Sequence, residues 1–62
     1  MKVNGKRYKV EVTKKVDDDG SYFYSALVVD FQECAIEGEG KTKFQAKRNA
    51  KKNLQFYLDY MY

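Results

Sequence analysis

The sequence predicts an α+β fold: a three-stranded antiparallel sheet followed by one long C-terminal helix packed on one face. Three observations predict it. The first two thirds of the chain contain short stretches of alternating, β-branched or aromatic residues, which are typical of strands. An Asp-Gly turn separates the first two stretches. From residue 42 the apolar spacing becomes helical, and neither Gly nor Pro follows.

The first strand is expected over residues 8–16. Tyr8, Val10 and Val12 alternate there with polar residues, as in a half-buried strand. Residues 17–20, Asp-Asp-Asp-Gly, then supply a turn, so a hairpin should follow.

The second strand is expected over residues 22–29, which are rich in aromatic and β-branched side chains. Residues 30–32 should turn into a shorter third strand around Cys34 and Ile36. Cys34 is then expected to act as a small buried apolar residue.

The helix is expected to begin after Thr42, which serves as N-cap and forms a capping box with Gln45. At about 100° per residue, one side of the helix carries an apolar face that should cover the sheet as core. This face consists of Ala46, Ala50, Leu54, Tyr57, Leu58 and Met61. Phe56 and Tyr60 lie on a flank of the helix, together with Asn49 and Asn53, where the domain offers these two aromatic rings no obvious partner.

The chain has 62 residues without internal repeats or linkers, which predicts a single domain over residues 1–62. Hydrophobic residues make up 44% of it, enough for a small core. Domains of this size bury only about 60% of their unfolded surface, so self-association would stabilise them. We therefore expect Phe56 and Tyr60 to contact a second copy or a partner protein.

Several classes of function are disfavoured. The chain has no His and one Cys, which excludes an intramolecular disulfide and a multi-thiolate zinc site. Residues 38–42, Gly-Glu-Gly-Lys-Thr, resemble the end of a phosphate-binding P-loop, but position 35 is Ala where that motif needs Gly. The acids at 17–19 lack the spacing of a calcium loop. We expect no enzyme activity, no metal and no cofactor.

No apolar run approaches the roughly 18 residues of a membrane span, and residues 1–10 have no apolar signal-peptide core. A cytoplasmic protein without a membrane partner is expected.

Charge is strongly segregated along the chain. Residues 1–15 carry six basic side chains and one acid, residues 16–40 carry seven acids and no base, and residues 41–52 carry six bases and no acid. The net charge of +3 therefore hides a polarised molecule whose field can steer oppositely charged partners.

The basic segment is the candidate nucleic-acid site. Its side chains gather around the positive end of the helix dipole and along an exposed arc, which suits phosphate groups. They are Lys41, Lys43, Lys47, Arg48, Lys51 and Lys52. The alternative is a solvated face that the acidic strands partly neutralise.

Residues 38–50 have the pattern G-x-G-x-T-K-x-x-A-K-x-x-A, which resembles the C-terminal motif of double-stranded RNA-binding domains. The resemblance implies a β-β-β-α core and phosphate contacts by Lys43 and Lys47. The chain departs from that family at Phe44 and Lys51, where the motif has Lys and Ala. It also lacks the family's first helix, and it has acids at 17–19 where a loop would enter a minor groove.

The chain is also similar to HicB-type antitoxins. Asp19-Gly20, residues 30–38 and the helix spacing from Thr42 to Leu58 follow that family's pattern, although the helix is basic here. This resemblance implies a small inhibitor of a protein partner. In size and composition the chain is similar to phage-encoded inhibitors of host nucleases, including anti-CRISPR proteins.

These observations predict a small binding protein whose basic helix docks on nucleic-acid phosphates or on a nucleoprotein. The alternative is an inhibitor of a nuclease or toxin. It would act through Asp17, Asp18 and Asp19 or through Phe56 and Tyr60.

Overall fold

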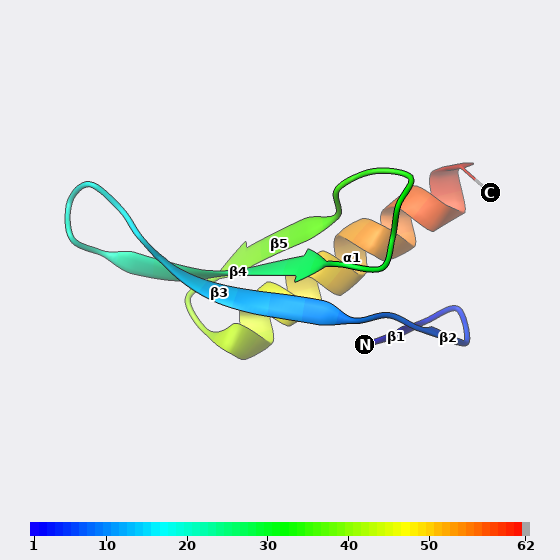
Figure 1. Cartoon of the computed structure of the whole chain (residues 1–62), viewed down its shortest axis with the longest axis horizontal. Coiled ribbons are helices and arrows are strands. Elements are labelled where there is room, and N and C mark those ends of the chain that lie inside the picture. Colours follow the sequence, from blue (N-terminus) through cyan, green and yellow to red (C-terminus); the bar gives the residue numbers. More distant parts are fainter. Residues whose placement is uncertain (62) are drawn as a thin grey trace.

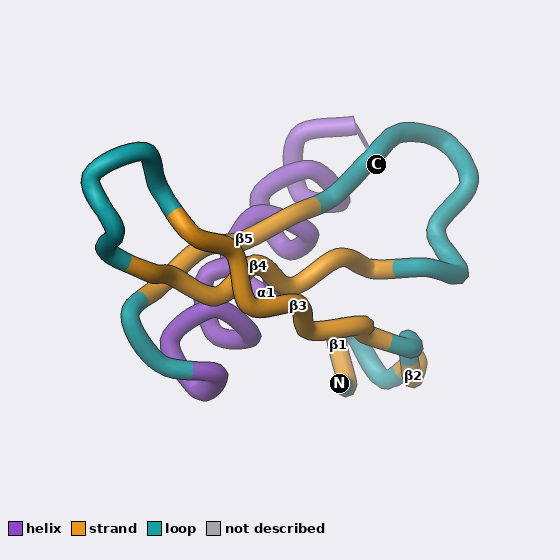
Figure 2. The backbone as a smooth tube through the Cα atoms, turned by 60° about the vertical axis from the view of Figure 1, so that its left-hand side comes forward, coloured by secondary structure: helices purple, strands orange, loops and turns teal. Residues whose placement is uncertain are grey.

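The computed structural model describes residues 1–61 and contains two small sheets and one helix (Figure 1). The elements are β1 (Lys2–Val3), β2 (Lys6–Arg7), β3 (Val10–Val16), β4 (Tyr22–Val28), β5 (Glu37–Gly40) and α1 (Lys43–Met61). Strands β3, β4 and β5 form an antiparallel three-stranded sheet in that order, and α1 crosses one face of it (Figure 2). The predicted fold class is confirmed.

The β3–β4 hairpin has the expected Asp-Gly turn. Val10 pairs with Val28 and Val16 with Tyr22, and the Asp17 N–H closes the hairpin on the Ser21 carbonyl at 2.8 Å. The tip extends well beyond α1 (Figure 1), and the molecule measures 40 Å along this direction against 17 and 16 Å across. The hairpin therefore projects as an arm.

The third strand lies further along the chain than predicted. It spans Glu37–Gly40, and Cys34 lies in the preceding loop, half-buried, so its assignment to a strand is wrong. The loop packs against the helix because Phe31 makes edge-on ring contacts with Tyr8 and Tyr57, at 6.2 and 5.4 Å between centroids. Partial burial raises the pKa of Tyr57, and the neighbouring Cys34 and Glu33 add to the shift.

Close approach of β5 to α1 explains where the third strand forms. A Cβ at Gly38 would overlap the Ala50 backbone nitrogen and would lie 2.6 Å from the Ala46 carbonyl oxygen. Ala46 and Ala50 are fully buried against Ala26 of β4. Small residues on both surfaces thus bring the strand directly onto the helix backbone.

The N-terminal hairpin of β1 and β2 was not predicted from the sequence. Asn4 and Gly5 form its turn with positive φ values of 51° and 79°, the conformation that Asn-Gly pairs favour. The hairpin brings Val3 into the main core with Tyr8 and Leu54. The Tyr8 N–H donates to the Met1 carbonyl at 2.7 Å, which fixes the chain end.

The helix begins as predicted. The Thr42 hydroxyl oxygen accepts a hydrogen bond from the Gln45 N–H at 3.1 Å, whereas the Gln45 side chain accepts from the N–H of Lys41 rather than from that of Thr42. Three members of the predicted apolar face are buried, Tyr57 and Leu58 are half-buried, and Met61 is 55% exposed. The prediction for Met61 is wrong because the last turn of α1 extends past the sheet (Figure 1).

Candidate nucleic-acid interface

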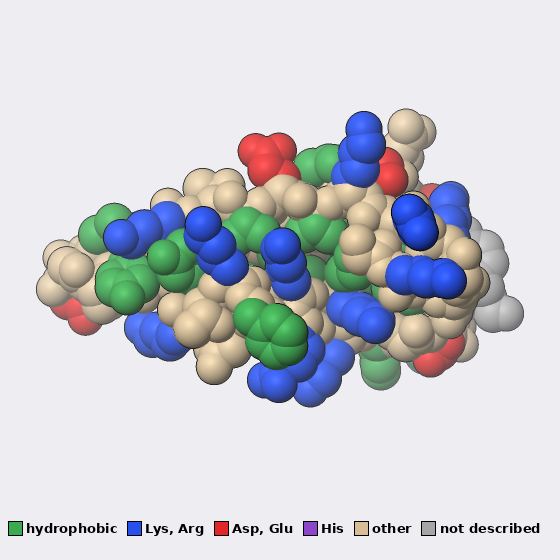
Figure 3. Space-filling view, turned by 90° about the horizontal axis from the view of Figure 1, so that it is seen from below, with side chains coloured by type: hydrophobic (Ala, Val, Ile, Leu, Met, Phe, Trp, Pro, Cys, Tyr) green, Lys and Arg blue, Asp and Glu red, His purple; other side chains and the backbone are tan. Residues whose placement is uncertain are grey.

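A basic hollow lies beside the N-terminal half of α1. It has a volume of about 420 Å³ and is bounded by the N-terminal segment, the start of β3 and α1. Its cationic lining residues are Lys2, Lys47, Arg48 and Lys51. Figure 3 shows Lys and Arg side chains spread over a face of the molecule on which acidic side chains lie near the margins.

The position of the helix on the sheet leaves this hollow open. Helix α1 packs mainly on β5 and β4 and touches β3 much less. The margin of β3 therefore stays uncovered, and Val10, Met1 and Phe44 give the hollow an apolar lining. The result is an apolar surface surrounded by positive charge.

The structure separates the six predicted basic residues into groups. Lys47, Arg48 and Lys51 line the hollow. Lys52 lies on the outer surface of the helix, next to Arg48 and Phe56. Lys43 is exposed in the first turn. Lys41 lies apart, because its ammonium group donates to the Tyr22 carbonyl at 3.3 Å beside the hairpin.

The helix cations are not neutralised within the described chain. Among residues 1–61, no acidic side chain pairs with Lys43, Lys47, Lys51 or Lys52, and the first turn of α1 holds no acid. Arg48 places its guanidinium 5.9 Å from the centre of the Phe44 ring. Positive charge therefore accumulates at the end of the helix where the dipole is also positive.

The strand acids lie on the opposite side of the molecule. Gly38 and Gly40 face α1, so Glu37 and Glu39 point to the other face of the sheet. Register places Glu11 and Glu37 on either side of Leu27 on that open face. The acidic strands therefore do not cover the basic helix.

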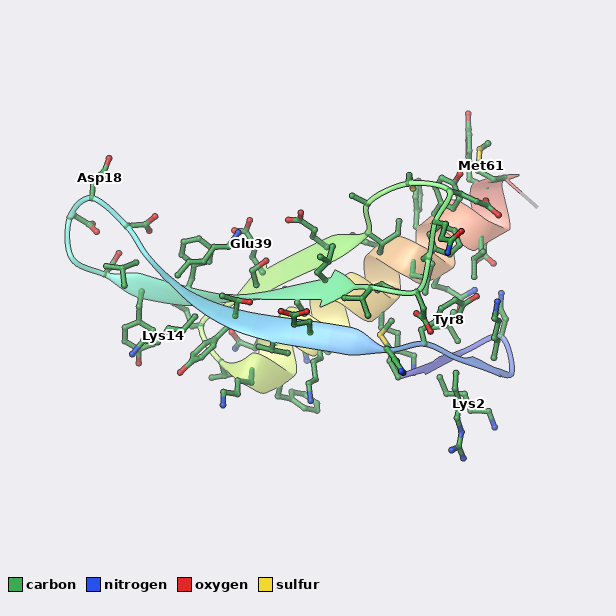
Figure 4. The ribbon with its side chains drawn as sticks, viewed as in Figure 1. Lys2, Tyr8, Lys14, Asp18, Glu39 and Met61 are labelled. Carbon is green, nitrogen blue, oxygen red and sulfur yellow. The ribbon has the colours of Figure 1, made fainter. Side chains whose placement is uncertain are left out.

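The acidic turn is an ordered, charged loop at the tip of the hairpin. The Asp19 carboxylate accepts hydrogen bonds from the Ser21 hydroxyl at 2.7 Å and from the Ser21 N–H at 3.0 Å. Both hydrogen bonds lower the pKa of Asp19 below its ordinary value of 3.8, and the bond from the hydroxyl has the larger effect. Asp18 sits at the tip, far from α1 (Figure 4).

Exposed aromatic rings follow the outer surface of the helix. Phe56 and Tyr60 are 73% and 80% exposed and stack on each other, with centroids 6.2 Å apart and planes 10° apart. Phe44, which was noted from the sequence only as a departure from the RNA-binding motif, is 71% exposed. In steps of four residues, Phe44 is followed by Arg48 and Lys52 and then by the two stacked rings, and rings beside cations suit base stacking.

Two other kinds of feature are absent from residues 1–61. No cluster of three His, Cys, Asp or Glu side chains there could hold a metal ion. No helix in this part of the chain is long and apolar enough to cross a membrane.

Comparison with known proteins gives no relative: no family model, no curated protein and no solved structure matches the chain. The resemblances to double-stranded RNA-binding domains and to HicB-type antitoxins therefore stay predictions that rest on the motifs. The N-terminal element is a hairpin, where the first of these families has a helix.

Proposed function

We propose that the chain is a non-enzymatic binding protein whose helix α1 docks on nucleic-acid phosphates, either alone or within a nucleoprotein. One observation supports this function above the others. Four cations surround a single open hollow, and the lysines beside it have no acidic partner among residues 1–61.

The charge and the geometry of the helix both favour phosphate binding. Lys43, Lys47 and Lys51 repeat every four residues, and each such like-charge pair costs a helix a few tenths of a kcal/mol. An anionic ligand along this row removes the repulsion. Phosphates of a nucleic-acid backbone provide regularly spaced anions, and displacement of their counterions supplies most of the binding free energy. Phe44 adds a ring on which an unpaired base can stack.

Fluorescence anisotropy with labelled duplex RNA, duplex DNA and single strands, each at several salt concentrations, tests the proposal. We expect saturable binding to at least one of them, with log K falling linearly against log salt. For four or five phosphate contacts the slope should be roughly −3 to −5. Absence of saturable binding to all three ligands at about 50 mM salt would contradict the proposal.

A second candidate function is inhibition of a basic protein such as a nuclease or toxin. The acidic turn favours it, because Asp17, Asp18 and Asp19 follow the end of β3 in the turn of the arm, and Asp18 lies away from α1 (Figure 4). Such a cluster suits a positively charged groove and would speed association with it. The exposed pair of Phe56 and Tyr60 offers this kind of partner an apolar contact.

Replacing Asp17, Asp18 and Asp19 with Asn separates the two functions. If α1 binds nucleic acid, removal of three negative charges should strengthen binding severalfold at low salt, because the general repulsion of phosphates falls. If a basic protein is the target, the same variant should associate about tenfold or more slowly. Anisotropy and stopped-flow association measure the two effects. An unchanged affinity for both ligand types would show that the turn is only a solvated loop.

A further inference from the structure

The two edges of the three-stranded sheet differ in their protection. At the β5 edge, the side-chain amides of Asn49 and Asn53 donate to the carbonyl oxygens of Glu39 and Glu37. The helix thus occupies two carbonyl groups of this edge. The β3 edge has no further strand beside it in residues 1–61 (Figure 2). Unprotected edges of this kind invite pairing with another strand.

The hydrogen bonds that flank β3 identify its outward groups. Val29 N–H donates to the Lys9 carbonyl at one end, and Asp17 N–H donates to the Ser21 carbonyl at the other. Since hydrogen-bonded residues alternate along an antiparallel ladder, odd-numbered residues of β3 bond to β4. The even-numbered residues, Val10, Val12, Lys14 and Val16, therefore direct their N–H and C=O groups outward.

We propose that β3 pairs with β3 of a second copy of the chain, antiparallel, about a twofold axis at Thr13. This register sets Val12 opposite Lys14 of the second copy, so two residues with outward groups meet and exchange backbone hydrogen bonds. It sets Val10 opposite Val16 of the second copy. Val16 is 69% exposed in the monomer and becomes covered by the facing valine.

Charge complementarity selects this register. Glu11 lies opposite Lys15 of the second copy, and Lys9 lies opposite Asp17, each pair occurring twice by symmetry. These are non-hydrogen-bonded positions, where facing side chains come closest. A shift of two residues in one direction places Lys9 opposite Lys15, and in the other direction it places Lys14 opposite itself. Both alternatives bring like charges together.

The pairing explains an unusual feature of this edge. Lysines commonly protect edge strands from association, and β3 carries Lys14 and Lys15. The Lys14 ammonium group lies over the Tyr22 ring, 4.4 Å from its centre, so this side chain has a contact within its own chain. Lys15 has no acidic partner among residues 1–61. In the proposed dimer it faces Glu11 of the second copy. The dimer has a continuous six-stranded sheet with both helices on one face.

A charge-swap experiment tests the pairing without touching α1. Sedimentation equilibrium of the unaltered chain should show a monomer–dimer equilibrium within concentrations up to about 1 mM. Glu11→Lys and Lys15→Glu should each weaken the dimer about tenfold or more, because each creates two like-charge pairs. An equimolar mixture of the two variants should form a heterodimer at least as tight as the original dimer. In it, position 11 of each copy faces a residue of opposite charge at position 15 of the other.

Two controls keep the result specific. Circular dichroism of each variant verifies that the monomer remains folded. The double variant Phe56→Ser and Tyr60→Ser tests the aromatic pair as the alternative interface and should leave the dimer unchanged. A chain that stays monomeric up to about 1 mM would overturn the proposal. So would a dimer that the aromatic variant dissociates, or one that the charge swap neither weakens nor restores.

Discussion

Replacing Gly38 with Ala is expected to unfold a large fraction of the chain. The added Cβ would overlap the backbone of Ala50 and Ala46, which cannot rotate away as a flexible side chain could. Overpacking commonly costs about 1 to 3 kcal/mol, and an overlap with backbone belongs at or above the upper end. A domain of this length has a total stability of about 3 to 9 kcal/mol. Separation of β5 from α1 would also break the Asn49 and Asn53 contacts.

Thermal denaturation followed by circular dichroism measures the effect. Gly38→Ala should lower Tm by roughly 12 °C or more, or show no folded baseline. Glu39→Ala is the matched control, because it changes the next residue of β5, whose side chain points away from the helix. It should melt within about 3 °C of the unaltered chain. Near-equal melting of both variants would mean that β5 lies further from α1 than the structure places it.

The contact between Gly38 and α1 shows why part of the fold could be predicted from sequence and part could not. Two-residue alternation at Tyr8, Val10 and Val12 is a local signal, and so is the Thr42 cap. Gly38 and Gly40 carry no apolar side chain, so their inward positions become evident only when Ala46 and Ala50 face them. The third strand was therefore predicted around the apolar Cys34 and Ile36 instead.

The N-terminal hairpin was missed for a different reason. Its strands have two residues each, too few for any alternation to be visible. The Asn4-Gly5 pair was the available signal, because this dipeptide favours the positive φ values of a tight hairpin turn. Val3 and Tyr8 on either side were consistent with a short buried hairpin.

The candidate site was predictable where it depends on one helix. Lys47, Arg48 and Lys51 follow from helical spacing and meet around the hollow. Lys2 joins them through tertiary packing of the N-terminal segment, which no local pattern indicates. Lys41 was grouped with them by sequence proximity, but it precedes the helix and reaches the Tyr22 carbonyl instead.

Replacing Lys43, Lys47 and Lys51 together with Gln is expected to weaken nucleic-acid binding by about a hundredfold or more near 0.1 M salt. Each phosphate contact contributes roughly 0.7 to 0.9 to the slope of log K against log salt, so loss of three contacts should flatten the slope by about two to three units. The stability of the folded state should not decrease. Removal of like charges at four-residue spacing should stabilise the helix by a few tenths of a kcal/mol per pair.

A matched variant separates this local effect from net charge. Lys6, Arg7 and Lys9 replaced with Gln removes the same three charges, but none of these residues lines the hollow. Long-range attraction falls equally in both variants, whereas direct phosphate contacts are lost only in the helix variant. The control should therefore retain most of the original slope. Equal slopes for the two variants would assign binding to the general positive field of the protein, and an unchanged slope in the helix variant would exclude α1 as the contact surface.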